Sequence, residues 1–351
     1  MVTNIKRLAF FEKFADPVAE RILGARDDID LVRLSYAGAE GDNWGELSRA
    51  HGYQIGARTE LRHPWFGDAN LIARCPSLLA ISSMGAGYDV IDVDACTKAG
   101  IIVCNQSGTN KEAVAEHALG LMLALSKKIV LSDRAMRRDK NLDRFLFTGN
   151  DLVGKTVGIV GIGNIGTRTA ELCRGLFRMR VLAYDPYLSK EQIAARGAEK
   201  VGLGDLIEQS DYITLHCPRT EETFGLFGFQ QFSRMKPTAY FINTSRGGTY
   251  KEDDLVEALR QKKLAGAGLD VFLEEPPPTD HPLFAFDNVI VSPHNAGVTH
   301  EALANMAAAT AEQWIEILSG KVPPRLINKA AWPKYSERFH ALLGFKPAPL
   351  A

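Results

Sequence analysis

The stretch that decides the fold is residues 157–185, VGIVGIGNIGTRTAELCRGLFRMRVLAYD. An apolar run leads into Gly161-x-Gly163-x-x-Gly166, a helical stretch follows, and a second apolar run ends at Asp185, 19 residues after the last glycine. In such a unit the first glycine permits a tight turn, the second lets the backbone approach a pyrophosphate, and the third lets the helix pack on the strand. We therefore predict a parallel α/β sheet that binds a dinucleotide at the helix N-terminus.

The acid at the end of the second run predicts which dinucleotide binds. A carboxylate at Asp185 would accept hydrogen bonds from an adenosine ribose and repel a 2′-phosphate. The predicted cofactor is therefore NAD rather than NADP. Use of NADPH as well as NADH would contradict this role of Asp185.

Length and composition restrict the remaining possibilities. A chain of 351 residues is long enough for two domains with separate cores. Its 41 basic and 42 acidic residues are balanced, which favours neither a nucleic-acid nor a membrane partner. The five cysteines are scattered and form no C-x-x-C pair, so we expect reduced thiols, no metal site and a cytoplasmic location. The charged N-terminus is unlike a signal peptide, and no apolar run is long enough for a membrane span.

Short apolar runs alternate with helical stretches on both sides of this motif, which predicts two parallel sheets. In the first half the expected strands are Lys6–Phe11, Asp30–Leu34, Tyr53–Gly56, Leu78–Ser82 and Ile101–Cys104. In the second half they are 157–160, 180–184, 212–215, 239–243, 265–270 and 289–292. A long helix is expected over 111–137, followed by a surface loop, and another over about 300–319, capped by Thr299. The tail beyond it is expected to pack on the first domain.

Three polar residues follow successive strands of the second half: Arg246, Glu275 and His294. Ligands of an open parallel sheet bind outside the carboxyl ends of its strands, so these side chains should converge beside the cofactor. Histidine can take a hydroxyl proton or return it, a carboxylate can orient the imidazole, and arginine can bind a substrate carboxylate. Each residue alone also has a structural interpretation, but three on adjacent strand ends favour hydride transfer between a hydroxy acid and its keto acid.

Several blocks in a fixed order resemble the D-isomer-specific 2-hydroxyacid dehydrogenase family, which includes phosphoglycerate dehydrogenases and glyoxylate and hydroxypyruvate reductases. The blocks are MGAGYDVIDVDAC (84–96), VAEH (114–117), the glycine motif through YDPY, HCP (216–218), NTSRGG (243–248), GAGLDVF (266–272), EEP and SPH. The resemblance implies that Arg246 binds substrate, that His294 is the acid/base, and that Glu275 pairs with His294. It also implies that backbone N–H groups around Gly85, Ala86 and Gly87 hold the substrate carboxylate.

The resemblance extends to the cofactor site, the domains and the assembly. The implied NAD contacts are Gly161, Gly163, Asn164, Ile165, Gly166, Asp185, Cys217, Thr223, Thr244, Asp270 and Gly297, with Asp270 at the nicotinamide carboxamide. The expected fold is a Rossmann NAD-binding domain, 110–297, inserted into a flavodoxin-like substrate domain, 1–109 and 298–351. The helix and loop at 111–150 are the expected homodimer surface.

Relatives within this fold differ at particular residues. Formate dehydrogenases carry glutamine in place of Glu275, and phosphite dehydrogenases carry lysine in place of Ala86, so both activities are disfavoured. Where the family often has tryptophan before the glycine motif, this chain has RFLF at 144–147. The alternative function is an NADH-binding regulatory or sensor protein of the same fold with little turnover.

Other polar residues receive mainly structural interpretations. His216 is expected to support the cofactor loop, and His117 to be packed on the long helix or at an interface. Four residues follow an early strand and are interpreted as a surface loop, with contact to the far end of the substrate as the alternative. They are Arg58, Arg62, His63 and Trp65.

Overall fold

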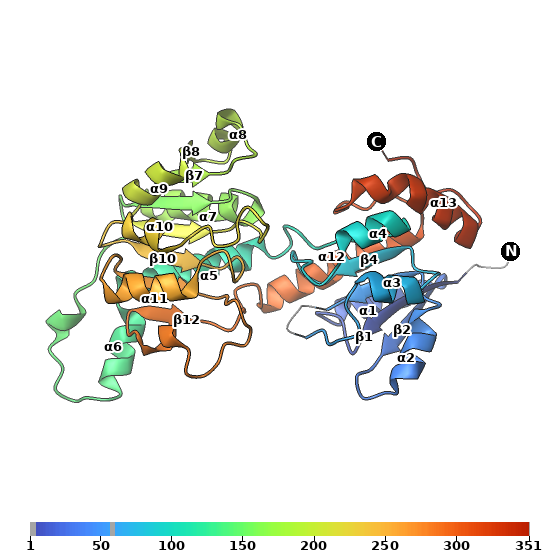
Figure 1. Ribbon diagram of the computed structural model, residues 1–351, viewed down its shortest axis with the longest axis horizontal. Helices are drawn as coiled ribbons and strands as arrows, with labels where there is room; N and C mark the ends of the chain where they lie inside the picture. Colours follow the sequence, from blue (N-terminus) through green and yellow to red (C-terminus); the bar gives the residue numbers. More distant parts are fainter. Residues whose placement is uncertain (1–4, 57–59, 351) are drawn as a thin grey trace. The chain divides into compact units, whose positions relative to one another are not determined.

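The protein folds into two α/β units (Figure 1). The structure is a computed structural model and describes residues 5–56 and 60–350. One unit consists of Met1–Asn110 and Thr299–Ala351, and the other of Lys111–Val298. Each has a single parallel sheet with helices on both faces, so the predicted fold class is confirmed. None of the helices in the described ranges is long and apolar enough to cross a membrane.

The first unit has a five-stranded sheet in the order β2-β1-β3-β4-β5, which is the flavodoxin-like order. Its strands begin and end within two residues of the predicted bounds, because each is a short buried run between turn residues. They are β1 (Lys6–Phe11), β2 (Ile29–Leu34), β3 (Gly52–Ile55), β4 (Ala80–Ser83) and β5 (Ile102–Cys104).

Alternate side chains of β1 enter cores on opposite faces of this sheet. Leu8 and Phe10 pack in one core, and Ala9 and Phe11 in the other. The first core is covered by α1 (Val18–Gly24), α12 (His300–Leu318) and α13 (Trp332–Leu343). The second is covered by α2 (Glu40–Leu47), α3 (Ala69–Arg74) and α4 (Val93–Ala99). The C-terminal helices therefore cover one face of the N-terminal sheet.

The second unit has a seven-stranded sheet in the order β12-β11-β10-β9-β6-β7-β8, the doubly wound dinucleotide-binding arrangement. We expected six strands. The additional strand is β8, a two-residue segment that has no detectable apolar periodicity. The strands are β6 (Thr156–Val160), β7 (Arg180–Tyr184), β8 (Glu199–Lys200), β9 (Tyr212–Leu215), β10 (Tyr240–Asn243), β11 (Gly266–Leu269) and β12 (Val289–Val291).

Two cores cover the faces of this sheet. On one face pack α5 (Lys111–Ser126), α7 (Asn164–Phe177) and α8 (Lys190–Ala195). On the other pack α9 (Leu203–Gln209), α10 (Phe229–Ser233) and α11 (Glu252–Arg260). The loops that follow the carboxyl ends of the strands carry the site described below.

The single long helix predicted over 111–137 is wrong, because the chain forms α5 and then a separate helix, α6 (Ile129–Met136). The carbonyl of Ser126 accepts a hydrogen bond from the N–H of Asn150 (2.8 Å), so it is not available to continue the helix. Lys128 then adopts a left-handed conformation with φ of 53°. Beyond α6, the predicted loop contains a 3₁₀ turn, η1 (Arg144–Phe147).

The loop after β3 is only partly the surface loop that was predicted. Arg62 and His63 are exposed, but Trp65 is 4% exposed and packs against Trp44 and Phe11. A large aromatic ring gains more free energy in the core than at the surface, so Trp65 is a core residue. Arg58 lies outside the described residues.

Candidate active site

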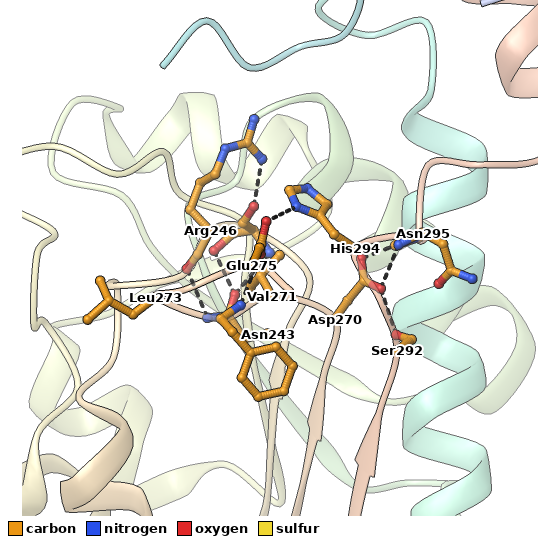
Figure 2. Close-up of polar contacts among 12 residues, drawn as sticks. Asn243, Arg246, Asp270, Val271, Leu273, Glu275, Ser292, His294 and Asn295 are labelled. Carbon is orange, nitrogen blue, oxygen red and sulfur yellow. Dashed lines mark hydrogen bonds and ion pairs between the residues drawn. The ribbon is translucent and has the colours of Figure 1, made fainter. Parts of the chain in front are cut away.

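Arg246, Glu275 and His294 come together at the carboxyl edge of the second sheet, where the parallel strands end (Figure 2). They lie in the loops that follow β10, β11 and β12, three neighbouring strands. His294 Nδ1 lies 2.8 Å from Glu275 Oε2, and Figure 2 shows the Glu275 carboxylate between the imidazole and the Arg246 side chain. These side chains converge because parallel strands end at one edge of the sheet.

Glu275 is held in its ionised form. Burial is the largest single influence and opposes ionisation. The hydrogen bond and charge of His294, the N–H of Phe272 donating to Oε1 (3.0 Å) and the charge of Arg246 together outweigh it. The pKa of Glu275 therefore lies below its ordinary value. A charged carboxylate at this distance orients the imidazole through the contact at Nδ1.

The backbone also holds His294 in place. Its φ of 53° is in the left-handed region, which is uncommon for a residue other than glycine. The N–H of His294 donates to the carbonyl oxygen of Asp270 (2.8 Å), which fixes this conformation. Backbone strain of this kind persists only where neighbouring contacts impose it, and it is frequent at functional sites.

Asp270 is buried beside this pair, and its carboxylate accepts three hydrogen bonds. Oδ1 accepts from Ser292 Oγ (2.6 Å) and the N–H of Asn295 (2.9 Å), and Oδ2 accepts from the N–H of Ala296 (3.0 Å). His117 Nε2 lies 3.0 Å from Ser292 Oγ. Since the hydroxyl proton is directed to Asp270, His117 is the donor in this contact. His117 is thus packed on the helix, and sequence analysis did not foresee its link to Asp270.

The glycine motif forms a turn between β6 and α7. Gly161 has φ of 86°, and a Cβ atom there would lie 2.8 Å from the N atom of Cys217. A Cβ atom on Gly166 would lie 2.3 Å from the carbonyl oxygen of Gly161. Both positions therefore require glycine, one for its backbone conformation and one for close packing. The helix begins at Asn164, so the N–H groups of its first turn lie at this turn.

Asp185 directly follows β7 and contacts the same turn. Its Oδ2 accepts from the N–H of Ile162 (3.2 Å) and its Oδ1 from the N–H of Tyr187 (3.1 Å). Those bonds fix the carboxylate beside the glycine turn, where a ribose hydroxyl would meet it.

The other residues predicted to contact the cofactor lie in α7 and in the loops after neighbouring strands. Thr223 Oγ1 donates to the carbonyl oxygen of Pro218 (2.6 Å) and so shapes the loop after β9. The Thr244 side chain is buried, and Oγ1 has no hydrogen-bond partner among the described residues. Burial raises the pKa of the Cys217 thiol to about 11, so this cysteine remains protonated. Ile165 lies in the first turn of α7, and Gly297 follows β12.

A comparison with protein-family models matches residues 119–296 to the D-isomer specific 2-hydroxyacid dehydrogenase, NAD binding domain. The glyoxylate reductase of Korarchaeum cryptofilum is 40% identical over 265 residues, which cover 75% of this chain and 80% of that protein. This chain belongs to the D-isomer specific 2-hydroxyacid dehydrogenase family. The resemblance predicted from the sequence blocks is therefore confirmed.

Two further members of the family illustrate the range of the similarity. The D-3-phosphoglycerate dehydrogenase of Archaeoglobus fulgidus is 43% identical over 261 residues, which cover 74% of this chain and 49% of that protein. The chain thus spans about half the length of that relative. A D-lactate dehydrogenase from Aquifex aeolicus, solved with NAD and lactic acid, has a TM-score of 0.74 at 28% identity. That match covers 89% of this chain and 96% of the other.

His216 lies in a structural environment, as the sequence predicted. Its Nε2 contacts the hydroxyls of Thr169 (3.2 Å) and Thr214 (3.1 Å), which tie α7 to β9. Burial lowers the pKa of His216 to about 3, so the ring is neutral at physiological pH. A neutral histidine bonded to two threonines positions a loop rather than transferring protons.

Gly85, Ala86 and Gly87 belong to the first unit, where they form a turn after β4. Each of the three is partly exposed. The sequence predicted that these residues bind the substrate, but it did not indicate which groups hold the turn. Over the described ranges, no three His, Cys, Asp or Glu side chains are arranged to hold a metal ion.

Proposed function

We propose that this protein interconverts a D-2-hydroxy acid and its 2-keto acid with NAD as the hydride carrier. The observation that carries the proposal is the hydrogen bond between His294 Nδ1 and Glu275 Oε2, 2.8 Å long, in a domain of a dehydrogenase family. A histidine supported by a carboxylate gives and takes protons near neutral pH. Interconversion of a carbonyl and an alcohol requires that proton transfer.

The residues at the carboxyl edge of the second sheet fit a dinucleotide. A Cβ atom on Gly163 would meet no heavy atom within 4 Å, so the backbone there is open to a phosphate. The buried Thr244 hydroxyl, which lacks a partner in the described structure, is suited to a cofactor amide or hydroxyl. The residues that would hold NAD are Gly161, Gly163, Asn164, Ile165, Gly166, Asp185, Cys217, Thr223, Thr244, Asp270 and Gly297. When bound, NADH supplies a hydride to the keto carbon.

In reduction, His294 donates a proton from Nε2 to the alkoxide oxygen as the carbonyl becomes a hydroxyl. Nε2 is the atom that transfers the proton because Nδ1 is engaged by Glu275. After the transfer the imidazole is neutral, and its Nδ1–H still donates a hydrogen bond to the Glu275 carboxylate. In oxidation the same nitrogen accepts the hydroxyl proton, and Glu275 stabilises the resulting imidazolium.

Two groups hold the substrate in this proposal. The Arg246 guanidinium binds the substrate carboxylate or polarises its carbonyl through its fixed set of donors. Backbone N–H groups of the Gly85–Gly87 turn bind the carboxylate, since successive N–H groups form a site for anions. The substrate class is a 2-keto acid, because these groups recognise a carboxylate next to a carbonyl.

The test is NADH oxidation at 340 nm against glyoxylate, hydroxypyruvate, pyruvate, 3-phosphohydroxypyruvate and 2-oxoglutarate. We expect turnover of at least one acid, and loss of that turnover in His294→Ala with NADH binding intact. His300→Ala is the matched control, because His300 is an exposed histidine at the start of α12. If NADH binds but no acid is turned over, the sensor function would take the place of this proposal.

We further propose that the protein is a homodimer through α6 and η1. None of the α6 side chains is buried within the described chain, and large apolar groups are exposed along this segment. They include Ile129 (54%), Met136 (73%), Phe145 (70%) and Leu146 (68%). Exposed apolar side chains gathered on one segment favour burial against a partner.

A further inference from the structure

The turn at Gly85–Gly87 is held by hydrogen bonds to all three of its carbonyl oxygens. The carbonyl of Gly85 accepts from the N–H of Gln106 (2.8 Å). The carbonyl of Ala86 accepts from Asn105 Nδ2 (2.7 Å), and that of Gly87 from Ser83 Oγ (2.5 Å). All three donors are on residues with at most 4% of their surface exposed.

The sheet places these donors beside one another. In the pairing of β4 with β5, Ser82 lies opposite Cys104. The next residues along, Ser83 and Asn105, therefore lie side by side where the two strands end. Asn105 is itself fixed, because its Oδ1 accepts from the N–H of Ser107 (3.3 Å) and its carbonyl accepts from Gln313 Nε2 (3.3 Å).

Anchored carbonyls determine where the N–H groups point. In a trans peptide the N–H of one residue is directed opposite to the carbonyl of the residue before it. The carbonyls of Gly85, Ala86 and Gly87 point to the buried donors, so the N–H groups of Ala86, Gly87 and Tyr88 point the other way. No described residue accepts a hydrogen bond from these three groups. They form a set of successive donors that suits a carboxylate.

We propose that Ser83 and Asn105 are positioning residues that aim the N–H groups of Ala86, Gly87 and Tyr88 at the substrate carboxylate. This inference rests on the proposed function, in which the turn binds that carboxylate, and it adds Tyr88 to the donors. Neither side chain touches the substrate. Each acts by fixing one peptide plane, so loss of either should weaken carboxylate binding without changing the chemistry of His294.

The variants Ser83→Ala and Asn105→Ala each remove one anchor. Ser82→Ala is the matched control, because Ser82 is a fully buried serine on the same strand whose hydroxyl contacts Gln106 Nε2 (3.5 Å) and Gln313 Nε2 (3.4 Å) rather than the turn. Ser83→Thr retains the hydroxyl and should restore binding.

The probe is oxamate, a carboxylate analogue of a 2-keto acid, titrated into the NADH-loaded protein by calorimetry. We expect its Kd to rise about tenfold in Ser83→Ala and in Asn105→Ala, as expected for weakened charge-assisted hydrogen bonds. In Ser82→Ala the Kd should stay within about twofold. KM for the keto acid should rise in parallel, with kcat and the Kd for NADH little changed. Kd values in both anchor variants equal to that of Ser82→Ala would overturn the inference.

Hydrogen exchange of the wild-type protein separates this inference from the proposed function. Oxamate should slow exchange at the amides of residues 86–88, and Ser83→Ala should abolish that protection. If the wild type turns over no keto acid but shows this protection, the positioning inference stands and the proposed function fails. If turnover is normal and oxamate leaves these amides unprotected, the inference fails and the proposed function stands. Absence of both turnover and protection would overturn both.

Discussion

Replacing Glu275 with glutamine tests the role of the His294–Glu275 pair most directly, because it removes the charge and keeps the size of the side chain. At an effective dielectric constant of about 20, opposite charges 2.8 Å apart attract by about 6 kcal/mol. The side chains of His294 and Glu275 are 35% and 18% exposed, so solvent screening and the cost of burying the carboxylate reduce this attraction. A net effect of about 1.5–4 kcal/mol corresponds to about a tenfold to thousandfold loss of kcat/KM.

We therefore expect Glu275→Gln to lower kcat/KM for keto-acid reduction by about tenfold to a thousandfold. In the wild type, the lowered pKa of Glu275 keeps the carboxylate charged as the pH falls towards the range where a free glutamate protonates, about 4.3. The carboxylate therefore stays charged over the whole range from pH 5 to 9. The loss of activity in Glu275→Gln should accordingly be present over the whole of that range.

The assay is NADH oxidation at 340 nm from pH 5 to 9, with KM for NADH measured in parallel. Glu274→Gln is the control, because Glu274 is an exposed neighbour. It should follow the wild-type profile. A Glu275→Gln profile that coincides with those of the wild type and Glu274→Gln would refute the assigned role of the pair.

Three other substitutions test the cofactor, the assembly and the packing. Asp185→Ser should raise the ratio of kcat/KM with NADPH to that with NADH by at least about tenfold, since it removes a repulsive charge; an unchanged ratio in the 340 nm assay would contradict the role of Asp185. Phe145→Asp replaces an aromatic ring that is 70% exposed with a carboxylate, and should lower the mass measured by light scattering from that of the proposed dimer to that of a monomer; an unchanged mass would argue against the η1 interface. Gly52→Ala places a Cβ atom 2.4 Å from the Trp314 ring and should lower the free energy of unfolding by about 1–3 kcal/mol. Gly45→Ala, with no heavy atom within 4 Å of the added Cβ, should cause no such loss in the same denaturation experiment.

Much of the fold was predictable because its strands are short buried runs between turn residues. Arg246, Glu275 and His294 were recognisable for a related reason, since each follows a strand of the parallel sheet. The type of residue at a strand end and the topology of the sheet then suffice to predict the edge where they gather. The roles of these three residues remain predictions.

Features that depend on contacts between distant residues were not predictable. The end of α5 depends on Ser126 and Asn150, which are 24 residues apart, so the apolar pattern continues where the helix does not. Trp65 resembles a loop residue by its polar neighbours, yet it fills the core against Trp44. The chain of hydrogen bonds from His117 through Ser292 to Asp270 joins α5 to the loops after β11 and β12, and only coordinates could reveal it.

The order in which the chain is synthesised affects the two units differently. The dinucleotide-binding unit is one continuous segment, so it has all its strands and helices once residue 298 has left the ribosome. The other unit starts first and finishes last, because one face of its sheet is covered only in part, by α1, until α12 and α13 emerge. Nascent chains therefore carry an exposed apolar sheet through most of translation, which is a state prone to aggregation. Because one domain is inserted into the other, the segment that is synthesised first is the last to become stable.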